Sequence, residues 1–148
     1  MKISSPIASI LIVGASLMGS AAGQASEPII TASAQSLNWE TTPEGVAFAS
    51  LVGDRFNEAY MAMVKLPGGL VSPPHTKSAN MFGVMVSGAM IHEAVGESSN
   101  IVLRTGSFYK IPRDVPHVSK CVSNEECVTF LYQDGKFDFL PVAGAASQ

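Results

Sequence analysis

The sequence predicts one all-β domain, a sandwich or barrel built from short strands. From Gly45 onward, short apolar runs alternate with turn-forming residues about every 8–12 residues, a spacing typical of such folds. No stretch shows the 3.6-residue periodicity of an amphipathic helix. The chain has 148 residues, of which 47% are hydrophobic and 14% charged. That composition suits a single packed domain and excludes a disordered chain.

The strands are expected between successive turn signals. The pair Ser87-Gly88 is typical of a two-residue hairpin turn that joins its flanking strands. Pro73 and Pro74 interrupt one apolar run, which is therefore at best an edge strand or a bent strand. In chain order, we expect strands at 46–52, 59–66, 71–77, 81–86, 89–95, 101–104, 107–111, 117–121, 128–132 and 136–140.

The N-terminal segment has the features of a secretory signal peptide. Lys2 is followed by the apolar run 7–18 and then by small residues up to Ala25. The run is about 12 residues long, whereas a membrane-spanning helix needs about 20. We expect cleavage after Ala25, or after Ala22 as the second choice, and a periplasmic or secreted protein. An uncleaved N-terminal anchor helix is the alternative.

The expected organisation follows from these boundaries. It comprises a signal peptide at 1–25, a short irregular N-terminal arm at 26–44, a β-barrel at 45–141 and a frayed tail at 142–148. Within the arm, Trp39 is the expected anchor onto the barrel.

Two cysteines, Cys121 and Cys127, are separated by five residues that include the turn-forming run 123–126. In an oxidising compartment such a pair forms a disulfide, which we expect at the end of a hairpin. A redox-active pair normally has two intervening residues. A metal or redox role and a pair of free thiols are the alternatives.

The formal net charge is -3, and no run of lysine or arginine is present. Nucleic acid is therefore not an expected partner. The sequence also lacks phosphate-binding and dinucleotide-binding glycine motifs and the nucleophile elbow of α/β-hydrolases. A small-molecule ligand is the expected partner, and a homodimer is compatible with the sequence.

Two stretches resemble the paired sequence motifs of the cupin superfamily. In that family the first motif is Gly, His, His, Glu, Gly and the second is Gly, Pro, Gly, His, Asn. Every interval of the first motif is matched by Gly69, His75, Lys77, Met81 and Gly88, and every interval of the second by Gly106, Pro112, Asp114, His117 and Cys121. The resemblance implies a single-domain cupin, a β-barrel or double-stranded jelly roll similar to small exported cupins of unassigned function.

The departures from the family motifs concern the metal ligands. A metal-binding cupin holds one transition-metal ion with three histidines and one glutamate, and only His75 and His117 match that set. Lys77 replaces the second histidine, and a lysine ammonium has no lone pair to donate. Met81 replaces the glutamate, and its thioether is poorly suited to Mn, Fe or Zn. Two protein ligands rarely hold a catalytic ion.

A third histidine, His92, offers a rearranged site. If Ser87-Gly88 forms a two-residue hairpin, Gly83 lies opposite His92, and both residues share the inward face of Met81 and Met85. His75, His92 and His117 would then hold one divalent transition metal. The alternative is a core histidine that is hydrogen-bonded to a neighbour and binds no metal.

Lys77 has three interpretations. Its ammonium, if buried, must be paired or its pKa must fall. It could turn to the mouth and pair with a carboxylate such as Asp114 or Glu93, hold an anionic ligand, or act as a base or Schiff-base lysine.

Two functions are compatible with these residues. The first is an exported cupin that binds a small organic molecule in a pocket made by His75, Lys77, Met81, Met85, His92 and His117. The alternative is a mononuclear-metal enzyme of dioxygenase, isomerase or lyase type that uses His75, His92 and His117. The sequence names no catalytic residue and does not decide whether the protein is an enzyme.

Overall fold

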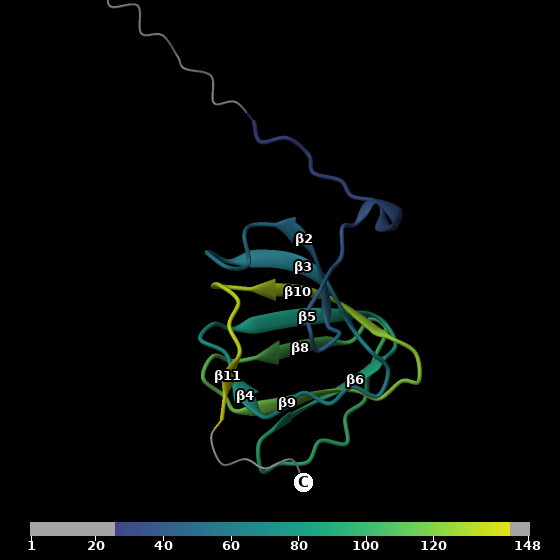
Figure 1. The fold of residues 1–148 in the computed structure, drawn as a ribbon, viewed down its shortest axis with the longest axis vertical. Coiled ribbons are helices and arrows are strands. Elements are labelled where there is room, and N and C mark those ends of the chain that lie inside the picture. The colour runs from purple at the N-terminus through teal and green to yellow at the C-terminus, as the bar shows by residue number, and fades with distance from the viewer. Residues whose placement is uncertain (1–25, 143–148) are drawn as a thin grey trace, which may run out of the picture. The chain divides into compact units, whose positions relative to one another are not determined.

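Two antiparallel β-sheets enclose the core in the computed structural model, which describes residues 26–142 (Figure 1). The predicted signal peptide and nearly all of the predicted tail lie outside the described residues. Of the described residues, 31–142 form the unit that contains both sheets. Among the described residues, no helix is long and apolar enough to cross a membrane.

The larger sheet has six strands and the smaller sheet has five, all paired antiparallel. In spatial order the six-stranded sheet consists of β1 (Glu40–Thr41), β2 (Ala47–Val52), β3 (Tyr60–Leu66), β10 (Cys127–Gln133), β5 (Met81–Ser87) and β8 (Phe108–Ile111). The five-stranded sheet consists of β11 (Leu140–Pro141), β4 (His75–Thr76), β9 (His117–Cys121), β6 (Ala89–Ala94) and β7 (Leu103–Arg104). A short 3-10 helix, η1 (Ala34–Ser36), precedes them.

Alternating burial along the strands fixes which side chains face the interior. In β3, Tyr60, Ala62, Val64 and Leu66 are buried, while the residues between them are more exposed. The same period-2 pattern runs through β10, which pairs with β3 along its whole length. Inward side chains of both sheets form one core, as expected when each sheet buries a single face. This confirms the all-β jelly-roll prediction.

The prediction of a hairpin at Ser87-Gly88 is wrong. β5 belongs to the six-stranded sheet and β6 to the five-stranded sheet, so the two strands do not pair. Gly88 has φ +79°, and a Cβ there would lie 2.9 Å from the Cα of Cys127. The turn therefore packs against β10 and carries the chain from one sheet to the other. Gly83 lies beside Tyr109 and Leu131 instead of His92.

The predicted Cys121–Cys127 disulfide is present, with Cα atoms 5.8 Å apart, but its expected setting is wrong. Cys121 ends β9 in one sheet and Cys127 begins β10 in the other, so no hairpin joins them. The bridge instead crosslinks the two sheets where the chain passes between them.

Four predicted segments are less regular or differently placed than expected, and in one of them, 101–104, only Leu103–Arg104 forms a strand. In 71–77 only His75–Thr76 forms a strand, because two consecutive prolines cannot donate to a ladder. In 136–140 only the last residue is in a strand, within β11. The predicted arm contributes η1 and also β1, which pairs with β2, and the Trp39 ring lies 4.4 Å from Nζ of Lys65.

Asp114 occupies the position of the glycine in the second cupin motif. Its φ is 61°, in the left-handed region that glycine adopts freely and that aspartate tolerates better than most residues. The backbone N–H of Asp114 donates a hydrogen bond of 2.8 Å to the carbonyl of Lys77. The unusual backbone at position 114 therefore helps to fix the position of Lys77.

Candidate functional site

A cavity of about 670 Å³ lies between the two sheets. Its walls are mostly apolar, and exposed residues such as Pro43, Val71 and Phe139 are among those that border it. The lining residues are Thr42, Pro43, Glu44, Val46, Phe48, Tyr60, Val64, Leu66, Leu70, Val71, Ser72, Pro73, His75, Lys77, Met81, Met90, His92, Tyr109, Ser119, Thr129, Leu131, Phe137 and Phe139.

The structure brings most of the predicted pocket residues to this cavity. His75, Lys77, Met81 and His92 line it. Met85 does not line the cavity and is packed in the core, where it is 1% exposed. His117 is also buried, and its ring centroid lies 4.2 Å from that of His75. His117 therefore supports the wall behind His75.

The three histidines share the inward face of the five-stranded sheet. His75 in β4 lies directly opposite His117 in β9, and His117 lies opposite Ala94 in β6. His92 is two residues before Ala94, so alternation places it on the same face. The inward direction predicted for His92 is thus correct, although it follows from pairing with β9 and the predicted pairing with Gly83 is absent.

Each histidine uses its Nδ1 atom within the protein. Nδ1 of His75 lies 2.8 Å from the carbonyl oxygen of Pro73, and Nδ1 of His117 lies 2.9 Å from that of Val115. A carbonyl can only accept, so both Nδ1 atoms carry the proton and both Nε2 atoms keep a lone pair in the neutral ring. Nδ1 of His92 lies 2.9 Å from the hydroxyl of Ser119.

Burial keeps these rings neutral at pH 7. It lowers the pKa of His75 to about 4 and that of His92 to about 4, and it also lowers the pKa of His117. Within residues 26–142, the buried Nε2 atoms of His92 and His117 have no hydrogen-bond partner. Buried polar atoms are normally paired, so these atoms need an explanation.

Lys77 is buried, and its ammonium points toward the segment that precedes β11. Nζ donates a hydrogen bond to the backbone carbonyl of Asp138 and lies 4.4 Å and 5.5 Å from the ring centroids of Phe137 and Phe139. Burial lowers the pKa of Lys77 to about 8, although the charge of Asp138 opposes that shift. The amine is therefore largely protonated at pH 7.

The expected carboxylate partners of Lys77 are engaged elsewhere. Asp114 pairs with Arg113, and Glu93 pairs with Lys120. Neither carboxylate pairs with Lys77, so the predicted ion pair of Lys77 with Asp114 or Glu93 is wrong.

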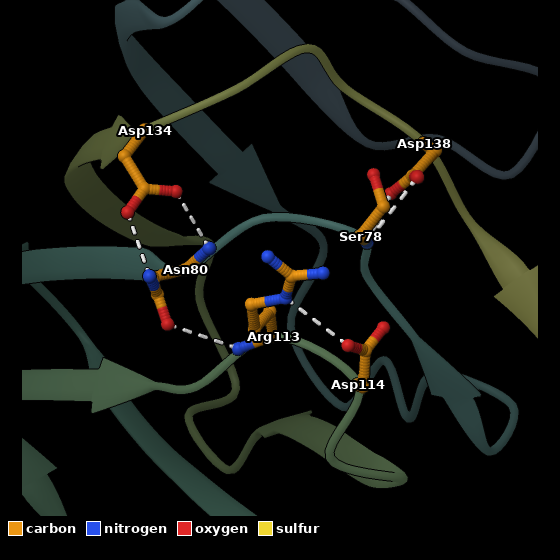
Figure 2. A network of polar contacts seen from close by, with 6 residues as sticks. All are labelled: Ser78, Asn80, Arg113, Asp114, Asp134 and Asp138. Atoms are coloured by element: carbon orange, nitrogen blue, oxygen red, sulfur yellow. Dashed lines mark hydrogen bonds and ion pairs between the residues drawn. The ribbon is translucent and has the colours of Figure 1, made fainter.

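Hydrogen bonds of Asp134 and Asp138 hold the segment 134–138 in place (Figure 2). Asp134 accepts hydrogen bonds of 2.8 Å and 2.6 Å from the backbone and side-chain nitrogens of Asn80. The side-chain oxygen of Asn80 accepts from the backbone of Arg113 at 3.1 Å, and the carboxylate of Asp138 accepts from the backbone of Ser78. These contacts fix residues 134–138 beside Lys77.

Phe139 follows this segment and covers His75 directly. The two rings are stacked, with centroids 4.1 Å apart and planes inclined by 16°. Phe139 is itself partly exposed, and its ring shields the buried His75 from solvent.

The donor set does not fit the metal that the cupin resemblance implies. In the part of the chain that the structure describes, no three His, Cys, Asp or Glu side chains are grouped so that they could hold an ion. Met81 stands where the glutamate ligand would be, and the cationic Lys77 stands where a histidine would be. A rearranged centre made by His75, His92 and His117 is therefore not formed in this conformation.

Several cavity residues were missed by the sequence reasoning. They are Tyr60, Tyr109, Ser119, Thr129, Phe137 and Phe139. Alternation from Ile111 and His117 could have identified Tyr109 and Ser119, since each lies two residues from an inward position. No local pattern marks Phe137 and Phe139, because they lie in an irregular segment.

Comparison with known proteins gives one family and one fold. Residues 22–140 match the family model described as a domain of unknown function, DUF4437. No curated protein matches the sequence.

Similar solved structures are cupins. KdgF from Halomonas sp. has a TM-score of 0.58 at 19% identity, with 74% of this chain and 94% of that chain covered. An RmlC-like cupin from Shewanella frigidimarina has a TM-score of 0.56 at 16% identity, with coverages of 70% and 88%. A recombinant oxalate oxidase in complex with glycolate has a TM-score of 0.54 at 19% identity, with coverages of 68% and 56%. At these identities the likeness concerns the fold alone.

Proposed function

The chain belongs to the DUF4437 family and has the fold of the cupin superfamily, and from its cavity we propose that it binds a small organic molecule between its two sheets. The observation that carries the proposal is the Nε2 atom of His92. It belongs to a residue that lines the cavity, it is buried, and it has no partner among the described residues. A bound molecule with a hydrogen-bonding group would satisfy it.

The size and lining of the cavity suit such a ligand. Sites for small molecules typically measure about 300–1,000 Å³ and combine apolar walls with a few polar groups. Here Phe48, Met81 and Leu131 belong to the apolar wall, and His75 and His92 provide neutral imidazoles. The ligand therefore has an apolar body and a polar group that can hydrogen-bond to an imidazole nitrogen.

The proposal does not extend to a mononuclear-metal reaction. Three protein ligands and an open position are the usual pattern of a catalytic ion, and the described side chains do not provide that grouping. In the donor set, Lys77 and Met81 replace two of the four cupin ligands.

We also propose that the protein is exported. The apolar run and small residues of segment 1–25 support a cleavable signal peptide. The Cys121–Cys127 disulfide supports an oxidising compartment. N-terminal sequencing of the protein recovered from the periplasm or the medium should start near Ser26, and a retained Met1 would contradict the proposal.

Methyl NMR tests binding in the cavity, because some methionines line the cavity and others lie outside it. Met81 and Met90 line the cavity, whereas Met61 and Met63 lie on the outer face of β3. In protein labelled at the methionine methyl groups, titration with 1-octanol should shift the first pair and leave the second unchanged. Shifts at Met61 and Met63 alone would contradict the proposal.

Two variants control the experiment. Val46→Trp places an indole in the cavity and should weaken binding, since Val46 is a partly buried lining residue. Val86→Trp adds the same side chain at a solvent-exposed position of β5 and should leave binding unchanged. Equal binding by both variants would place 1-octanol outside the cavity.

A further inference from the structure

We infer that the molecule bound in the cavity carries a carboxylate and that Lys77 binds it. This inference rests on the proposed function and adds the chemical class of the ligand. Lys77 is the only buried Asp, Glu, Lys or Arg within the described range 26–142. It also lines the cavity, where the other charged residue of the lining, Glu44, is exposed. The interior of the protein thus holds one cation next to the space that a ligand would occupy.

Among residues 26–142 this cation forms no ion pair, and the charge of Asp138 offsets its burial only in part. Asp138 acts on Lys77 through its charge, but both of its carboxylate oxygens accept from the backbone N–H of Ser78 (Figure 2). Asp138 offers only its backbone carbonyl to Nζ. Buried charges are normally paired, so the missing partner is expected from the ligand.

The ammonium retains the capacity to bind that partner. An ammonium has three N–H donors, and one is used by the carbonyl of Asp138. The rings of Phe137 and Phe139 provide cation–π contacts but accept no conventional hydrogen bond. Neither neighbouring histidine carries a charge at pH 7. A carboxylate oxygen could therefore accept from Nζ without displacing an existing ion pair.

The number of charges favours a monocarboxylate over a phosphate. One buried ammonium balances a single negative charge, whereas a phosphate dianion would keep one negative charge without a cation in the described lining, where Glu44 is the other charged residue. The lining also contains apolar and aromatic side chains, among them Met81, Leu131 and Phe137, and the Phe137 ring contacts Nζ of Lys77. The ligand class is thus a monocarboxylic acid with an apolar body.

Calorimetric titration with a matched pair of probes tests this inference. Octanoate and 1-octanol share an apolar body and differ in the head group. At pH 7 we expect wild-type protein to bind octanoate at least about 10-fold more tightly than 1-octanol. Lys77→Met should remove that preference while retaining 1-octanol binding. Lys110→Met, which removes an exposed lysine of β8, should change neither affinity.

The outcomes separate this inference from the proposed function. If octanoate and 1-octanol bind equally to wild type, or if Lys77→Met keeps the octanoate preference, the carboxylate inference is wrong and the cavity function stands. If neither probe binds, the proposed function fails. Lys77→Gln, which keeps a donor for the carbonyl of Asp138, repeats the test and should also lose the preference. Near-ultraviolet circular dichroism confirms that each variant is folded.

Discussion

Replacing Lys77 with methionine should make the protein more stable at pH 7. Burial lowers the pKa of Lys77 from its ordinary value of 10.5 to about 8, because the interior disfavours the ammonium. At about 1.4 kcal/mol per pH unit, that difference corresponds to a destabilisation of about 3 kcal/mol in the charged state. Cation–π contacts with Phe137 and Phe139 offset on the order of 1 kcal/mol. Methionine, which is also unbranched, should therefore stabilise the fold by about 2 kcal/mol.

The stabilisation should depend on pH in a defined direction. Between pH 8 and 10.5 the unfolded chain binds a proton at position 77 that the folded protein has lost, so wild-type stability rises with pH in this window. The advantage of Lys77→Met should therefore be largest near pH 7 and small at pH 10.5. The other titratable groups are common to wild type and variant, so their contributions cancel in the difference between the two free energies of unfolding.

Urea unfolding followed by Trp39 fluorescence and circular dichroism measures the effect. Trp39 is the single tryptophan and contacts Lys65 of β3, so it reports on the six-stranded sheet. Lys110→Met serves as the control for removal of an exposed lysine. A variant less stable than wild type at pH 7, or a stability difference that is equal at pH 7 and 10.5, would refute the argument that Lys77 is a buried unpaired cation.

Four further predictions follow from the same geometry. Unfolded, unreduced protein should contain no titratable thiol, and Cys121→Ser should lower stability about as much as the double variant with Cys127→Ser, by about 2–2.5 kcal/mol from loop closure; additive losses in unfolding experiments would refute this. Gly83→Ala should destabilise the protein by roughly 2 kcal/mol or more in the same assay, because the added Cβ overlaps the Tyr109 ring, and an unchanged midpoint would refute it. Stability should fall as pH drops from 6.5 toward 4, where the unfolded chain takes up protons that buried His75 and His92 resist; His92→Gln should weaken this dependence, and an identical pH profile would count against it. Restoring the cupin ligands with Lys77→His and Met81→Glu should confer stoichiometric metal binding in elemental analysis, and a variant that binds no more metal than wild type would show that these two residues do not determine the difference.

The sequence was sufficient for the long strands and for the residues that face the interior. Alternation and turn residues located β3, β5, β9 and β10 to within a residue or so, because these strands bury one face. The cupin motif spacing placed His75, Lys77, Met81 and His117 in or beside one interior region.

Which strands pair with each other could not be predicted from the sequence in the same way. A short Ser-Gly turn suits a hairpin, but it also suits a corner at which the chain changes sheets. The two cases differ in long-range contacts, here the packing of Gly88 against Cys127. The disulfide was predicted from cysteine spacing and compartment, which hold for either geometry.

The orientation of Lys77 also depended on tertiary structure. Its hydrogen-bond partner is the backbone carbonyl of Asp138, and because every residue has such a carbonyl the sequence does not identify this one. Phe137 and Phe139 reach the cavity from an irregular segment that is fixed by the hydrogen bonds of Asp134 and Asp138. Periodicity does not extend to such a segment.

Native mass spectrometry of the wild-type protein incubated with octanoate tests the central claim most directly. The account predicts one octanoate per chain, because the mostly apolar cavity is lined by Lys77, which forms no ion pair among the described residues. It also predicts no metal ion, because in the described part of the chain no three His, Cys, Asp or Glu side chains are grouped so that they could hold one. A chain that carries one metal ion and no octanoate would contradict it.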